Sequence, residues 1–175
     1  MALALAKSAT TSGVLMTVGD ILCQAITLRS SPNAKLDLTR TGRFAAAGFL
    51  LHGPIFHAGF RFADKKVAAL ALKPRVELAL KVAILQLATF PAYLAAFFPA
   101  MGMMEGRGWA SSSKRSIELF PKAYTAGLCF WPFVNIVNFS YFQPSQRMVV
   151  ANVAGVFFNT ALSFINSSNP KNREE

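Results

Sequence analysis

A carboxylate stands in the middle of an apolar segment near the start of the chain, and its neighbours form a regular stripe. The stripe consists of small and polar residues spaced 3, 4, 3, 4 and 3 apart, namely Thr10, Gly13, Thr17, Asp20, Gln24 and Thr27. This spacing places them on one face of a helix whose other faces are mostly apolar. An ionisable group in such a segment is costly in hydrocarbon, so Asp20 is a candidate for a buried ion pair or for contact with a passing solute.

Three further stretches carry small, polar or charged residues at helical spacing. They comprise Arg40, Arg43, Ala47, Leu50, Pro54, His57, Arg61 and Asp64; Trp131, Asn135, Asn138 and Phe142; and Asn152, Gly155, Asn159 and Ser163. Two interpretations are open: these residues hold helices together through hydrogen bonds, or they converge on a polar cavity or pore. Asp20 needs an opposite charge under both interpretations. The candidates for its partner are Arg43, Arg61, Lys81 and Arg147.

The sequence offers no pattern typical of catalysis or of a metal or cofactor site. His52 and His57 are five residues apart, so they do not share a helix face as paired ligands do. Cys23 and Cys129 lie in separate apolar segments, and we expect packed thiols rather than a disulfide. We therefore expect a protein that is not an enzyme and that has neither metal nor cofactor.

Long apolar segments must position these residues. Five can be drawn, at residues 3–28, 37–64, 76–101, 121–142 and 145–166. Each is close to the roughly 20 residues that cross a hydrocarbon core as a helix. Prolines predict interruptions near Pro54, Pro91 and Trp131-Pro132. Residues 114–120 are typical of a short interfacial amphipathic helix.

We therefore predict an all-α, polytopic transmembrane helical bundle with four to five hydrophobic helices plus a short interfacial helix. Residues 1–175 are expected to form a single integral-membrane domain. No signal peptide or Arg-rich presequence is distinct from the first apolar segment, so we expect any organelle address to be internal.

Composition supports a membrane protein and limits its partners. The chain is 53% hydrophobic and only 15% charged, with a net charge of +10, and its mean hydropathy is +0.38. A polar, basic, soluble face for nucleic acid is lacking, so no nucleic-acid partner is expected. Basic loops that contact anionic lipid head groups fit the charge better, and acidic neighbours in a larger inner-membrane complex remain an alternative.

The ordered motifs resemble the Mpv-seventeen / twenty-two-kilodalton peroxisomal membrane protein family. The C-terminal signature is carried by Trp131-Pro132, Asn138-Phe139, Pro144, Arg147, Asn159 and Leu162-Ser163. The earlier matches are Gly19-Asp20, Gln24, Asp37, Arg40-Thr41, Arg43, Gly48, Gly53-Pro54, His57, Asp64, Lys81, Gln86 and Pro91. The resemblance extends over nearly the whole chain.

The chain also departs from the family pattern at four places. Leu85-Gln86 stands where the family usually has Asp-Gln, and Gly59-Phe60 stands where it has Trp-Tyr. Asn135 replaces a usual Gln, and Phe158 replaces a usual Trp. The loss of a second intramembrane acid at Leu85 weighs against an inherited channel mechanism.

The resemblance implies a multi-pass protein of the mitochondrial inner membrane or, alternatively, of the peroxisomal membrane. Family members are proposed to be channels that pass small solutes and affect membrane potential. The alternative is a non-conducting accessory subunit of a respiratory or ATP synthase complex, and a lipid- or porphyrin-binding module is a third reading that rests on the 16 phenylalanines.

In the channel reading, Asp20 and Gln24 lie opposite Arg43 or Arg147, and Trp131, Asn135 and Asn138 line the same cavity. The full set of candidate interior residues is Thr17, Asp20, Gln24, Arg43, His57, Trp131, Asn135, Asn138, Arg147 and Asn159. We expect Asp20 to face the bundle interior beside an arginine or lysine, and Arg147 to anchor the start of the last helix by binding an acid or a lipid phosphate.

Overall fold

Every regular element is a helix in the part of the chain that the computed structural model describes, residues 2–29 and 35–167. The helices are α1 (Ala2–Arg29), α2 (Leu38–Ala47), α3 (Gly53–Ala68), α4 (Pro74–Ile84), α5 (Phe90–Met104), α6 (Trp109–Tyr141) and α7 (Arg147–Ser167). Two π-helical segments, η1 (Gly48–His52) and η2 (Leu85–Thr89), join α2 to α3 and α4 to α5. The predicted all-helical class is confirmed for these residues.

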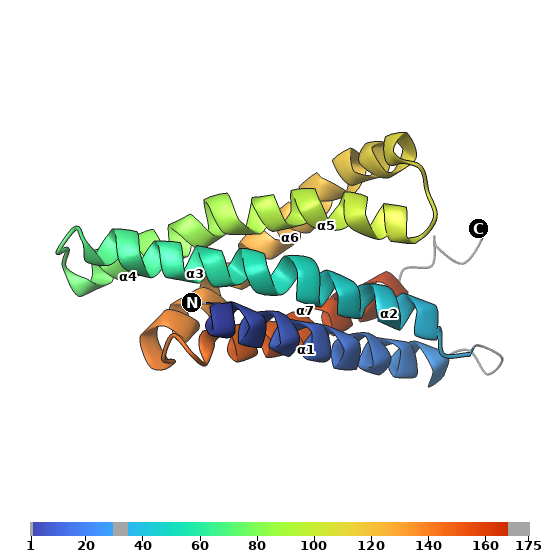
Figure 1. Cartoon of the computed structure of the whole chain (residues 1–175), viewed down its shortest axis with the longest axis horizontal. Coiled ribbons are helices and arrows are strands. Elements are labelled where there is room, and N and C mark those ends of the chain that lie inside the picture. The colour runs from blue at the N-terminus through green and yellow to red at the C-terminus, as the bar shows by residue number, and fades with distance from the viewer. Residues whose placement is uncertain (1, 30–34, 168–175) are drawn as a thin grey trace.

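The helices form five long rods that lie side by side (Figure 1). The segment η1 continues α2 into α3, and η2 continues α4 into α5, so each of these groups is one rod. The other three rods are α1, α6 and α7. The rod α2–η1–α3 packs against α1, which also packs against α7, and α5 packs against α6. The start of α2 and the connection from α5 to α6 lie at the same end of the bundle (Figure 1). This arrangement brings residues from the 37–44 and 101–116 regions close together.

Proline explains where the two π-helical segments lie. Pro54 and Pro91 stand at the start of α3 and α5, directly after η1 and η2. A proline inside a helix lacks an N–H donor, and its ring collides with the carbonyl four residues earlier. Widening the preceding turn into a π segment is one way to relieve this collision. The interruptions predicted near Pro54 and Pro91 are confirmed, whereas the one at Trp131-Pro132 is wrong because α6 continues through it.

The rod α2–η1–α3 approaches α1 closely at two glycines. A Cβ atom added to Gly53 would lie 2.5 Å from Ala9 Cα, and one added to Gly48 would lie 2.6 Å from the Ser12 carbonyl oxygen. Only hydrogen fits between these two backbones. Small residues at such contacts are typical of helix packing in membranes.

The expected interfacial helix at residues 114–120 does not exist as a separate element. These residues belong to α6, which runs unbroken from Trp109 to Tyr141. Pro121 lies inside that helix without ending it. The serines and basic residues of 111–116 therefore extend the fourth rod beyond its apolar part.

The outside of the bundle is apolar, and much of its inside is polar. Phe133, Leu87 and Phe157 are each about 70% exposed, with values of 71%, 69% and 69%. Fully or nearly buried polar side chains include Asn138 and Asp20. Two described helical segments, Ala2–Ile26 and Pro74–Met104, are long and apolar enough to cross a membrane by length and composition. Exposed apolar area of this extent indicates contact with lipid or with other proteins.

Candidate functional site

Asp20 lies at the centre of a buried polar cluster between α1 and α2. Its carboxylate accepts hydrogen bonds from Thr41 Oγ1 and Gln24 Nε2, both at 2.7 Å from Oδ2. Its other oxygen, Oδ1, is 2.9 Å from Arg40 Nε, but that contact is off hydrogen-bond alignment and is mainly Coulombic. The Asp20 side chain is 1% exposed and that of Arg40 is 47% exposed. The Asp20 carboxylate is therefore shielded from solvent, whereas the Arg40 side chain is about half exposed to it.

Gln24 fixes the start of α2 against α1. Its Oε1 accepts the backbone N–H of Asp37 at 2.7 Å, and its Nε2 donates to the Asp37 carbonyl at 3.1 Å. Asp37 caps α2 by accepting the backbone N–H of Arg40 at 2.8 Å. These bonds position the first turn of α2, and with it Arg40, beside Asp20.

The expected cationic partner of Asp20 is present, but its predicted identity is wrong. The partner is Arg40, which lies one turn before the expected Arg43. Arg43 instead lies 4.0 Å from Glu105, and Lys81 and Arg147 both bind Asp64. The overlooked signal is the chain reversal between α1 and α2, which brings the first turn of the second helix toward the end of the first.

A second charged cluster joins four rods near the C-terminal end of α3, at the other end of the α2–η1–α3 rod from the Asp20 cluster. Arg147 Nη1 is 2.5 Å from Asp64 Oδ2, and Lys81 Nζ is 3.1 Å from Asp64 Oδ1 and 2.6 Å from Glu77. The Arg147 guanidinium also lies 4.6 Å from the centre of the Phe139 ring. The expectation that Arg147 anchors the start of the last helix through an acid is confirmed, since Arg147 is the first residue of α7.

A cavity of about 400 Å³ lies inside the bundle. Its wall is mainly aromatic and aliphatic, and polar groups enter it from Asp20, Arg40, His52, Tyr93, Trp131 and Asn152. The buried indole Nε1 of Trp131 has no hydrogen-bond acceptor in the described part of the chain. The volume falls in the range of about 300–1,000 Å³ that is common for ligand pockets.

Of the predicted interior residues, only Asp20 and Trp131 line this cavity. Thr17 Oγ1 donates to the Gly13 carbonyl of its own helix at 2.8 Å, and His57 Nδ1 is 2.9 Å from Ser8 Oγ. Asn138 donates to the Arg147 carbonyl at 3.1 Å, and Asn135 is buried in α6. The expected cavity wall of Trp131 with Asn135 and Asn138 is therefore wrong for the two asparagines, which are buried but do not line the cavity. The Asn159 side chain lies outside the described residues.

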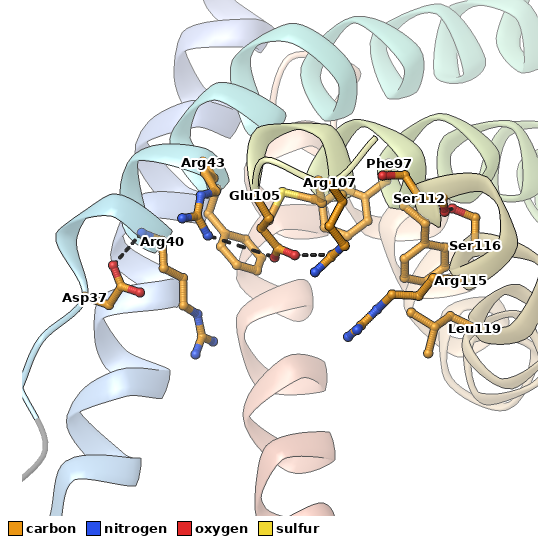
Figure 2. A pocket seen from close by; sticks show the side chains of 14 residues that line it. Asp37, Arg40, Arg43, Phe97, Glu105, Arg107, Ser112, Arg115, Ser116 and Leu119 are labelled. Atoms are coloured by element: carbon orange, nitrogen blue, oxygen red, sulfur yellow. Dashed lines mark hydrogen bonds and ion pairs between the residues drawn. The ribbon is translucent and has the colours of Figure 1, made fainter. Parts of the chain in front are cut away.

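A second pocket, of about 450 Å³, opens at the end of the bundle where α2 starts and α5 ends (Figure 2). Four arginines line it from three segments: Arg40, Arg43, Arg107 and Arg115. Glu105 pairs with Arg43 and with Arg107, whereas Arg115 has no ion pair in the described part of the chain. The sequence analysis missed Glu105, Arg107 and Arg115, because all three lie between the apolar segments 76–101 and 121–142, where no long helical stripe places their side chains.

The two pockets share one wall. Arg40, Phe44, Phe97 and Phe98 line both of them. The Arg40 guanidinium lies 5.7 Å from the centre of the Phe44 ring, and the Phe44 and Phe97 rings are 6.2 Å apart. A basic mouth therefore adjoins an aromatic interior, with the Asp20–Arg40 pair at the junction.

Comparisons with known proteins find relatives that match nearly the full chain. The profile of the Mpv17 / PMP22 family matches residues 102–163. A Dictyostelium discoideum protein named PXMP2/4 family protein 4 is 31% identical over 93% of this chain and 86% of its own length. The chain belongs to the Mpv17 / PMP22 family.

Two fungal relatives extend the comparison. Protein sym1 of Aspergillus oryzae is 34% identical over 90% of this chain and 87% of its own length. Protein SYM1 of Saccharomyces cerevisiae is 29% identical over 89% of this chain and 80% of its own length. No solved structure matches the chain. As a member of the Mpv17 / PMP22 family, the chain is a membrane protein, and the exposed apolar exterior of the bundle fits that conclusion.

Proposed function

We propose that this protein is an organellar membrane protein that passes or regulates small solutes through the two joined pockets. The observation that supports the proposal is the shared wall at Arg40, Phe44, Phe97 and Phe98, at which the arginine-lined mouth adjoins the cavity inside the bundle. The Asp20–Arg40 pair lies where the two pockets adjoin, so its charges can select among the solutes that pass there.

The proposal includes four or five membrane crossings. Two helical segments meet the length and hydropathy expected of a span. The other rods carry exposed apolar side chains and bury their polar groups, as α6 does with exposed Phe133 and buried Asn138. The mitochondrial inner membrane is the proposed location, with the peroxisomal membrane as the alternative. Anionic lipid head groups at the basic loops are proposed partners, and neither nucleic-acid binding nor an enzymatic activity is part of the proposal.

Reconstitution tests this function directly. Purified protein in planar bilayers should give discrete current steps, and Asp20→Asn should change their ion preference because one fixed charge at a narrow junction shifts selectivity. Glu118→Gln is the matched control, because it also removes one carboxylate charge, at an exposed position that lines neither pocket. An Asp20→Asn protein with unchanged ion preference would contradict the proposed path.

A non-conducting accessory subunit of a respiratory or ATP synthase complex is the alternative function. Leu85 favours it, because this side chain is 1% exposed and packs in the apolar core where related proteins usually have an acid. In this case the protein should migrate inside a large assembly after gentle solubilisation, and reconstituted material should pass no current. If the solubilised protein migrates by itself, outside any large assembly, and the reconstituted protein gives current steps, the accessory-subunit function is excluded.

A further inference from the structure

We infer that the joined pockets bind an amphiphile with an anionic phosphate or carboxylate head, the head lying among the arginines of the mouth and the apolar body in the aromatic cavity. The inference concerns the same cavity as the proposed function and rests on binding alone. Binding without conduction would leave it intact, and conduction without binding would overturn it.

The mouth presents donors that the described part of the chain leaves unused. The buried Nε atoms of Arg43 and Arg107 have no hydrogen-bond partner, and neither has the buried Oγ of Ser112. Ser112 is 1% exposed and lines the pocket. Buried donors without acceptors are costly. A phosphate or carboxylate offers several acceptor oxygens, and arginine binds such groups with its planar fork.

The charge of the mouth favours an anion. Glu105 serves two arginines, since it lies 4.0 Å from Arg43 and pairs more closely with Arg107. Asp37 also lines the pocket, so its wall carries four arginines and two carboxylates, which leaves two surplus positive charges. Arg115 reaches the same space from α6 and has no ion pair in the described part of the chain (Figure 2).

The interior is mainly apolar, so it can hold an alkyl chain beyond an anionic head. Its wall includes Phe56, Phe90, Leu94 and Phe158, and it exposes far more apolar than polar surface. A small inorganic anion would fill the mouth only and leave this cavity unused. Burial of an alkyl chain there removes its apolar surface from water, which favours binding.

The position of the mouth fits a head group. It lies at one end of the bundle, beside the start of α2 and the connection between α5 and α6 (Figure 1). The cavity inside the bundle adjoins the mouth at the shared phenylalanines. An amphiphile in this orientation keeps its charge at the end of the rods and its chain among the helices, as a lipid does in a leaflet.

Tryptophan fluorescence can report the apolar body directly. The chain has two tryptophans, of which Trp131 lines the cavity and Trp109 is 65% exposed. In the Trp109→Phe protein, purified in a neutral maltoside detergent, Trp131 is the one remaining indole. Bromine-substituted dodecyl phosphate should quench it in a saturable way, and bromine-substituted dodecyl maltoside should quench it much less at the same concentration.

Variants of the mouth test the head group. Arg43→Gln and Arg115→Gln should each weaken the dodecyl phosphate affinity by about tenfold, the cost expected for one lost charged hydrogen bond. Lys114→Gln is the matched control, because it removes the same charge from the neighbouring position of α6, outside the pocket wall. Arg115 makes no ion pair in the described part of the chain, so its variant should unfold at the same temperature as the parent protein, which separates lost binding from lost folding.

Three results would overturn the inference. The first is equal quenching by the phosphate and maltoside probes, which would indicate an apolar cavity without head-group recognition. The second is an equal loss of affinity for Lys114→Gln and Arg115→Gln. The third is full displacement of the probe by inorganic phosphate at matched concentration, which would assign the mouth to a free anion and remove the role of the apolar chain.

Discussion

Replacing Asp20 by asparagine should destabilise the bundle by about 2–3 kcal/mol, and the structure shows why. The change keeps the shape of the side chain and removes its charge. The asparagine oxygen can still accept from Thr41 and Gln24, which both bind Oδ2. Its amide NH₂ then faces the Arg40 guanidinium, so two donors stand where an ion pair stood.

The magnitude follows from the unequal burial of the two partners. Breaking a fully buried ion pair costs about 3–5 kcal/mol, and breaking an exposed one costs about 0–1 kcal/mol. The Asp20 side chain is 1% exposed and that of Arg40 is 47% exposed. The expected cost lies between the two limits because Arg40 regains water when its partner is lost.

The assay is reversible unfolding in mixed micelles, with a double-mutant cycle over Asp20→Asn and Arg40→Gln. The two single variants should each lose stability, and the double variant should lose less than their sum because the pair is broken only once. Asp37→Asn, at the exposed helix cap, should stay within about 0.5 kcal/mol of the parent protein. An Asp20→Asn protein as stable as Asp37→Asn, with additive single variants, would refute the reasoning.

Three further predictions concern other parts of the bundle. Arg147→Lys should lower the free energy of unfolding by about 1–2 kcal/mol, because lysine keeps the charge but cannot donate through the planar fork, and equal stability would contradict this role. Gly53→Ala should destabilise strongly, since its Cβ would lie 2.5 Å from the α1 backbone, whereas Gly42→Ala, with no atom within 4 Å of the new Cβ, should be neutral or slightly stabilising by the same unfolding assay. Single cysteines placed at residues 42–62 in a background without native cysteines should resist rapid aqueous labelling, and rapid labelling throughout would rule out this membrane span.

Apolar length and proline positions predicted the rods well, because these features act locally. Backbone groups in an apolar segment must bond to each other, which favours helix wherever the apolar stretch is long enough. Pro54 and Pro91 predicted the two interruptions because a proline disturbs the turn before it. Pro132 fails as a signal because the same disturbance can be absorbed within a continuous helix, as in α6.

The wall of the cavity was harder to predict because it depends on how each rod is rotated. The stripe from Arg40 to Asp64 assumes regular α-helical spacing, but η1 lies in its middle. One extra residue in a turn rotates everything after it by about 100°. Arg40 lines the cavity and pairs with Asp20 of α1, while His57 contacts Ser8 of α1 and does not line the cavity. The sequence spacing alone did not distinguish these two positions.

The basic mouth depends on contacts between residues far apart in the sequence. Arg43 lies near the start of the second rod, and Arg107 and Arg115 flank the start of the fourth. These arginines come together only because the start of the second rod and the start of the fourth lie at the same end of the bundle. That placement depends on the order and direction of all the rods. The charge excess of the chain predicts an anionic partner, but only the tertiary structure shows where the arginines gather.

The most direct test of the central claim is to block the proposed path with a thiol reagent while current is recorded. Met16 lines the cavity, and Leu87 is 69% exposed on the outside of the bundle. In a Cys23→Ser, Cys129→Ser background, a charged methanethiosulfonate should reduce the current of the Met16→Cys protein and leave that of Leu87→Cys unchanged. If the reagent leaves the Met16→Cys current as unchanged as the Leu87→Cys current, solute passage through the joined pockets is contradicted. The absence of current in both proteins before treatment would also contradict it.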